Sequence, residues 1–107
     1  MLIITEKNIE DKKSSIKATL NYYLRQMDLN KVDEADKNFF TEGCQSLLES
    51  LDNIKNAMIM IHSSKPEEHI KQIRTIKKQT ELIFLESKVH LNDLMQAARM
   101  TIRSYRM

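Results

Sequence analysis

The side chains best suited to bind a metal or attack a substrate are Cys44, His62, His69 and His90. No two of them have the spacing that places paired metal ligands on one face of a helix. Glu86 and His90 are four residues apart, whereas carboxylate-bridged di-iron bundles use a Glu-x-x-His motif twice. We therefore predict no bound metal or cofactor, and we interpret Glu86 and His90 as a surface pair.

The same residues offer little for catalysis. The chain has a single glycine, Gly43, so it contains no glycine-rich loop to hold a phosphate. Its serines stand near no convincing arrangement of a base and an acid. Cys44 falls on an apolar stripe, where a cysteine is most simply a small buried side chain. We predict no catalytic residues and no enzymatic activity.

That apolar stripe is the strongest pattern in the sequence. Its residues follow one another at alternating spacings of four and three: Phe40, Cys44, Leu47, Leu51, Ile54, Met58 and Ile61. A stripe with this repeat lets one helix lie along another, as in a coiled coil. It predicts helix partners for this segment and indicates no chemistry.

The composition predicts an all-α fold. The chain of 107 residues, with 41% hydrophobic and 30% charged residues, is long enough to bury a core and has enough apolar surface to fold as one domain, residues 1–107. One glycine and one proline leave little material for tight turns. Lysine, glutamate, leucine and methionine are abundant, as is typical of helices.

Charge and cysteine content limit the expected class of partner and the expected cellular location. Seventeen basic and fifteen acidic residues give a net charge of +2, which is too balanced for a dedicated nucleic-acid or membrane-surface protein. One cysteine allows no internal disulfide, and the start of the chain lacks the features of a secretory signal. We expect no membrane-spanning segment and a cytoplasmic location.

Three helices account for nearly all of the sequence. The first is predicted at about residues 6–27, with one apolar stripe formed by Ile9, Ile16, Leu20, Tyr23, Leu24 and Met27. The second is predicted at about residues 31–62, with Asn30 as its N-cap. The third is predicted at about residues 65–106, after a capping box from Ser64 to Glu67.

Gly43 leaves the second helix open to alternatives. A glycine inside a helix costs about 1 kcal/mol relative to alanine, so the helix is expected to bend or restart near residues 40–43 unless the glycine has another use. That other use is the close approach of a neighbouring helix, for which the missing side chain makes room.

These helices predict an antiparallel three-helix bundle, in which long helices two and three form a hairpin and the shorter first helix packs on it. The main apolar stripe of helix three is Ile70, Ile73, Ile76, Thr80, Ile83 or Phe84, Ser87, Leu91, Leu94 or Met95, Ala98, Ile102 and Tyr105. Two segments are apolar on more than one side: residues 57–61 and the middle of helix three, where Leu82, Leu85 and Val89 form a second stripe. Such segments need cover from a neighbour, so we expect dimerisation to complete the bundle.

The predicted length of helix three adds a second expected contact surface. At 1.5 Å per residue it spans about 60 Å, and folding back around Ser64 pairs Leu47 with the region near Leu82. Residues after about Ala98 are then expected to overhang. We predict that a partner binds this overhang and the second stripe, at Arg99, Met100, Ile102, Arg103, Tyr105, Arg106, Leu82, Leu85 and Val89.

The predicted function is that of a small protein-binding accessory factor of the chaperone, adaptor or inhibitor type. Its expected partner is a second copy or a helical segment of another protein. The alternative is a nucleic-acid-binding regulator, because Arg99, Arg103 and Arg106 share one helix face with Tyr105 adjacent. Arginines at the end of a helix also complement its dipole, which is the simpler interpretation.

Overall fold

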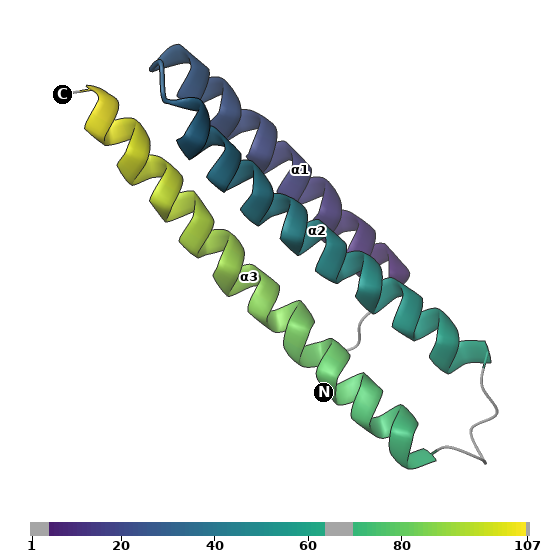
Figure 1. Ribbon diagram of the computed structural model, residues 1–107. Helices are drawn as coiled ribbons and strands as arrows, with labels where there is room; N and C mark the ends of the chain where they lie inside the picture. The colour runs from purple at the N-terminus through teal and green to yellow at the C-terminus, as the bar shows by residue number, and fades with distance from the viewer. Residues whose placement is uncertain (1–4, 64–69, 107) are drawn as a thin grey trace.

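The computed structural model describes residues 5–63 and 70–106, with side chains at 5–59 and 74–106. It contains three helices, α1 (Glu6–Leu29), α2 (Glu34–Ser63) and α3 (Ile70–Arg106). Helix α2 packs antiparallel to both α1 and α3, and α1 packs on both of the others (Figure 1). The predicted all-α, antiparallel three-helix bundle is therefore confirmed.

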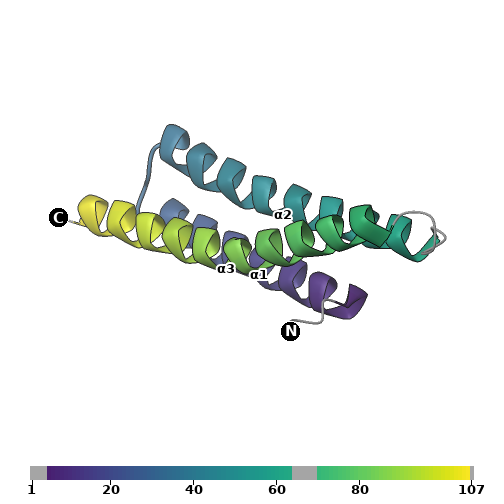
Figure 2. The same ribbon diagram turned by 90° about the horizontal axis from the view of Figure 1, so that it is seen from below.

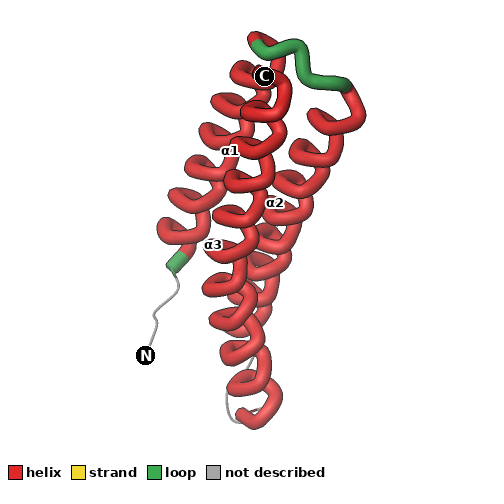
Figure 3. The backbone as a smooth tube through the Cα atoms, turned by 90° about the vertical axis from the view of Figure 1, so that its left-hand side faces the viewer, coloured by secondary structure: helices red, strands yellow, loops and turns green. Residues whose placement is uncertain are grey.

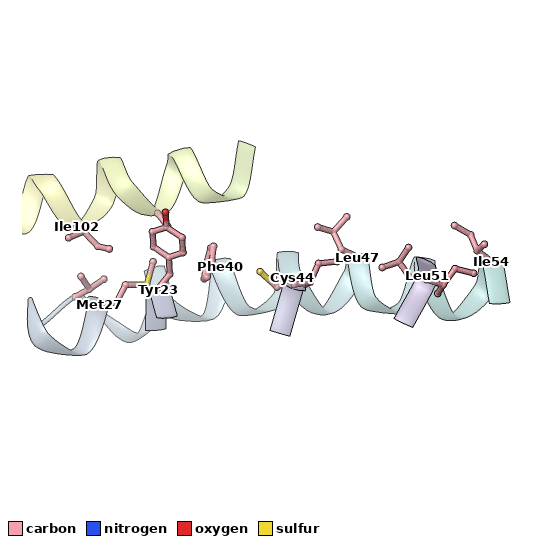
Figure 4. Packing of buried hydrophobic residues seen from close by; sticks show 12 residues of the cluster. Tyr23, Met27, Phe40, Cys44, Leu47, Leu51, Ile54 and Ile102 are labelled. Carbon is pink, nitrogen blue, oxygen red and sulfur yellow. The ribbon is translucent and has the colours of Figure 1, made fainter. Parts of the chain in front are cut away.

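The core forms where the predicted stripes of α1 and α2 meet (Figure 4). Buried side chains from α1 are Ile9, Ile16, Tyr23 and Met27, and those from α2 are Phe40, Cys44, Leu47, Leu51 and Ile54. Met58 packs against this cluster and is partly buried, while the side chain of Ile61 lies outside the described residues. The repeat in the second helix therefore identifies one wall of the core.

Helix α3 buries both polar and apolar side chains. Thr80, Ser87, Ala98 and Ile102 are its buried side chains. The Thr80 hydroxyl donates a hydrogen bond to the Ile76 carbonyl at 2.7 Å, and the Ser87 hydroxyl donates one to the Phe84 carbonyl at 2.6 Å. Because both hydroxyls are satisfied within their own helix, they can be buried without losing a hydrogen bond.

The connection between α1 and α2 differs from its prediction. Asn30 is the C-cap of α1 and not the N-cap of α2. The Lys31 N–H donates to the Asp28 carbonyl at 3.2 Å, and the Val32 N–H donates to the Met27 carbonyl at 3.0 Å. This is the Schellman pattern that ends a helix, and Lys31 accordingly has a φ of 57°. The predicted N-cap was wrong because asparagine suits either end of a helix.

Helix α2 is continuous through Gly43, so the predicted bend or restart is absent. A Cβ atom at this position would lie 2.6 Å from Leu94 Cδ2 of α3. The glycine therefore makes room for the neighbouring helix, as the alternative interpretation expected. Helix α2 begins at Glu34, and the Asp33 carbonyl before it accepts a hydrogen bond from the Lys37 N–H at 3.1 Å.

Ion pairs fasten α1 to α2. The Lys13 Nζ atom lies 2.6 Å from Asp52 Oδ1, and the Lys55 Nζ atom lies 3.0 Å from Glu10 Oε1. The hydrogen bond from Lys13 lowers the pKa of the Asp52 carboxyl, and the one from Lys55 lowers the pKa of the Glu10 carboxyl. Together they join the first half of α1 to the C-terminal half of α2.

The hairpin of α2 and α3 extends beyond the described start of α1 (Figures 2 and 3). Glu6, the first residue of α1, reaches Lys55 of α2 at 3.8 Å. Lys12 lies over the ring of Phe84 in α3, with its Nζ atom 4.6 Å from the ring centroid. The difference in helix length therefore appears at the end of the bundle that holds the last turns of α2 and the first turns of α3.

None of the described helices combines the length and apolar character needed to cross a membrane.

Candidate functional site

The residues with catalytic or metal-binding potential do not come together. Among the described residues, no group of three or more histidine, cysteine or acidic side chains is placed to hold a metal. Cys44 is fully buried, and burial raises the pKa of its thiol to about 11, so the thiol stays protonated at neutral pH. Glu86 and His90 are both exposed on α3. The side chains of His62 and His69 lie outside the described residues.

The C-terminal end of α3 is packed against the bundle and is not an overhang. Ile102 belongs to the core, with 5% of its surface exposed. The Tyr105 hydroxyl donates to the Asp36 carboxylate at 3.1 Å and accepts from the Asp33 N–H at 3.4 Å. The predicted overhang is therefore wrong, while partner binding at this end stays a prediction.

A shift in helix register explains this error. The predicted pairing set Leu47 beside the region near Leu82. In the structure Gly43, one turn earlier in α2, contacts Leu94. That contact lies about two turns further along α3 than the predicted pairing implies. The last turns of α3 consequently reach the α1–α2 connection, which Figure 1 shows beside the C-terminal end.

Two arginines of this end reach across to α1. The Arg99 Nε atom donates a hydrogen bond to the Tyr23 hydroxyl at 2.8 Å. The Arg106 Nε atom donates one to Asn30 Oδ1 at 3.2 Å. Met100 points elsewhere and has 62% of its surface exposed. The predicted binding residues of this end therefore divide into side chains that hold the bundle together and side chains that face outward.

A cavity of about 220 Å³ lies between α1 and α3 at this end, and we call it the arginine groove. Helix α1 lines it with Tyr22, Tyr23 and Gln26, and α3 lines it with Arg99, Ile102, Arg103 and Arg106. No acidic residue is among these lining residues. The groove therefore gathers the positive charges of three arginines beside two aromatic rings.

The middle of α3 carries a different surface, formed by Leu82, Leu85 and Val89, which we call the outer stripe. Their exposed fractions are 56%, 54% and 59%, although all three are large apolar side chains. The core residues of α3 lie on the opposite side of this helix, because Thr80, Ser87 and Ala98 differ from the stripe by about half a turn. Within a single chain the three-helix bundle leaves the outer stripe uncovered.

The arginines of the groove were predicted from the sequence as binding residues, whereas Tyr22 and Gln26 were not. The prediction placed Tyr105 beside them, whereas Tyr105 bonds to Asp33 and Asp36 and does not line the groove. The other residues that line the groove beside Arg99, Ile102, Arg103 and Arg106 are Tyr22, Tyr23 and Gln26, and all three belong to α1. The adjacent pair Tyr22 and Tyr23 could have indicated an exposed aromatic ring, since neighbouring residues of a helix point in different directions and only one of them can face the core of the bundle.

Comparison of the chain with protein-family models, curated proteins and solved structures finds no match. Its own surfaces are therefore the available indication of function. Among them are an uncovered apolar stripe on the middle of α3 and a positively charged groove at the C-terminal end of the same helix. The stripe is suited to another helix, and the groove is suited to an anion.

Proposed function

We propose that the protein is a non-catalytic helix-binding module, an accessory factor that associates through the outer stripe of α3. The observation that carries this proposal is the exposure of three neighbouring large apolar side chains, Leu82, Leu85 and Val89. Single exposed apolar residues are ordinary on a protein surface, whereas contiguous ones indicate an interaction site. Adaptors, chaperones and inhibitors of this size act through such contacts.

The spacing of the outer stripe favours a helix as the partner. Leu82, Leu85 and Val89 follow one another at three and four residues, which is the spacing of a seam between two helices. Lys78 precedes the seam and Asn92 follows it at the same spacing. The apolar part is therefore short and closed by polar residues at both ends, which limits the register of a partner helix.

Charges beside the seam favour a second, antiparallel copy of this chain. With Leu82 of each copy against Leu85 of the other, Glu81 of each copy faces Lys88 of the other. A parallel pair would instead bring Glu81 and Glu86 together, which is a repulsion. In the described part of the chain, neither Glu81 nor Lys88 has an ion pair that would have to break.

The short seam predicts a reversible dimer. Stable protein interfaces bury about 1,200–2,000 Å² in total, and three apolar side chains from each copy fall short of a large hydrophobic contact. We therefore expect monomer and dimer to exchange as the protein concentration changes. The aliphatic stem of Lys78 extends the seam by packing on Val89 of the second copy.

Sedimentation equilibrium over a wide concentration range tests this proposal. The parent chain should show a dimer at high concentration, and Leu85→Lys should abolish it because a charge then enters the seam. Met100→Lys is the matched control, since Met100 is similarly exposed on α3 but lies outside the seam. It should leave the dimer unchanged.

A charge exchange tests the antiparallel register. Glu81→Lys alone should weaken the dimer, because it then faces Lys88 of the other copy, and the double variant Glu81→Lys/Lys88→Glu should restore it. A chain that remains monomeric at every concentration would contradict self-association. A dimer whose dissociation constant is the same in the parent and in both charge variants would contradict this register.

A further inference from the structure

The arginine groove holds an excess of positive charge that the described residues do not neutralise. Arg99, Arg103 and Arg106 stand on the α1 side of α3, at intervals of four and three residues. Every ion pair seen in the described part of the chain is made by a lysine. Three guanidinium groups without an acidic partner repel one another, so an anion bound among them would be stabilised by all three.

Two of these guanidinium groups are already oriented. Arg99 donates through Nε to the Tyr23 hydroxyl, and Arg106 donates through Nε to Asn30 Oδ1. The Asn30 amide is held in turn, because its Nδ2 atom donates to the Gln26 carbonyl at 2.7 Å. A guanidinium has five N–H donors and Nε supplies only one of them. The terminal nitrogens remain available for the forked contact that phosphate oxygens accept.

The groove also presents an aromatic ring. Tyr22 has 56% of its surface exposed. Its ring packs edge to face with Tyr23, with 5.1 Å between ring centroids and 84° between ring planes. A ring held in this way is a platform on which a nucleic-acid base can stack. A simple anion or an acidic peptide would make no use of it.

The dimensions suit a short single strand. Seven residues of helix separate Arg99 from Arg106, which is about 10 Å. Phosphates of a stacked strand follow one another at about 3.4 Å along the strand axis, so the span of the three arginines covers about three phosphate steps. A base can stack on Tyr22 only when it is outside a duplex, because in a duplex each base is stacked between its neighbours, which cover both of its faces.

We infer that the arginine groove binds a short segment of single-stranded nucleic acid, with the three arginines on its phosphates and Tyr22 under one base. This site is separate from the outer stripe, which lies on the middle of α3. Loss of one activity therefore does not remove the other, and the two are tested with different variants.

Fluorescence anisotropy of the full chain with a labelled single-stranded oligothymidine tests the arginines. Binding should appear at low salt, and a plot of log affinity against log salt concentration should have a slope of about −2 for three phosphate contacts. Arg103→Glu should lower the affinity about tenfold or more, because it replaces an attraction to phosphate with a repulsion. Arg103 is exposed and makes no hydrogen bond seen in the described residues, so the fold should survive.

Arg74→Glu is the matched control, since it makes the same charge change at an exposed position of α3 far from the groove. It should change the affinity by less than about twofold. An equal loss in both variants would overturn the inference, because it would show attraction to net charge alone. Absence of binding at low salt would overturn it as well.

Tyr22 variants test the stacking contact. Tyr22→Ser should lower the affinity for the oligonucleotide about tenfold, whereas Tyr22→Phe, which keeps the ring, should bind as the parent does. Pyrophosphate, used as a competitor, should bind the parent and the serine variant equally. An oligonucleotide affinity that ignores the serine substitution, or duplex binding as tight as single-strand binding, would overturn the assignment. Circular dichroism checks that each variant keeps its helices.

Discussion

Two regions of α3 that look alike in sequence behave differently in the bundle. Its C-terminal end buries Ile102 and is joined to the rest of the chain through hydrogen bonds of Arg99 and Tyr105. Its middle leaves Leu82 and Leu85 exposed. Both regions mix apolar and charged residues, so composition does not separate them. The difference shows that the direction of a side chain relative to the other helices, and not its position along the chain, determines its exposure.

The largest expected effect comes from truncating one apolar residue in each region. Ile102→Ala should lower the free energy of unfolding by about 2–5 kcal/mol, because it leaves a cavity in the core. Leu82→Ala should change it by less than about 0.5 kcal/mol, because the side chain is already in water. Urea denaturation at a protein concentration too low for dimers measures both. Equal losses would contradict the proposed difference between the regions.

A smaller effect is expected from the hydrogen bonds of the C-terminal end. Tyr105→Phe removes the donor to Asp36 and the acceptor for the Asp33 N–H, and it should cost about 1 kcal/mol of unfolding free energy. Tyr22→Phe is the matched control, because no hydrogen bond of the Tyr22 hydroxyl is seen within the described residues. Thermal denaturation should show a lower midpoint for the first variant only; the same midpoint in both would mean that the end of α3 is not held by Tyr105.

The smallest expected effect is a pH dependence of stability, which comes from an ion pair between α1 and α2 and does not involve α3. Folding lowers the pKa of Asp52, chiefly through its hydrogen bond from Lys13. Its contribution to stability is therefore present above the unfolded carboxyl value of about 4 and is lost as pH falls through the lower folded value. The Asp52 side chain is half exposed to solvent, so the effect is modest.

Thermal denaturation between neutral pH and about pH 2 measures this contribution. Asp52→Asn should be less stable than the parent at neutral pH and should lose less stability on acidification. Glu86→Gln is the control on α3, where no ion pair of Glu86 is seen in the described part of the chain. A parent and an Asp52→Asn variant with the same acid response would contradict the role assigned to the Lys13 pair.

Much of the fold could be predicted because helix periodicity is a local property. The spacing from Phe40 to Ile54 identified the buried side of α2, and the spacing of Ile9, Ile16 and Tyr23 identified that of α1. The end of α1 was predicted less well, because Asn30 suits both a C-cap and an N-cap and only the neighbouring backbone selects between them.

The amino-acid sequence by itself determined three helices, an all-α bundle and the apolar side of each helix, since these depend on residues within a few turns of one another. Only the tertiary structure decided how far α3 slides along α2, because that register depends on contacts such as Gly43 with Leu94 between residues distant in the chain. The register in turn decided that Tyr105 reaches Asp36 and that Arg99 reaches Tyr23. It thereby placed the arginine groove between α1 and α3. The apolar periodicity of one helix does not specify how these two helices lie against each other.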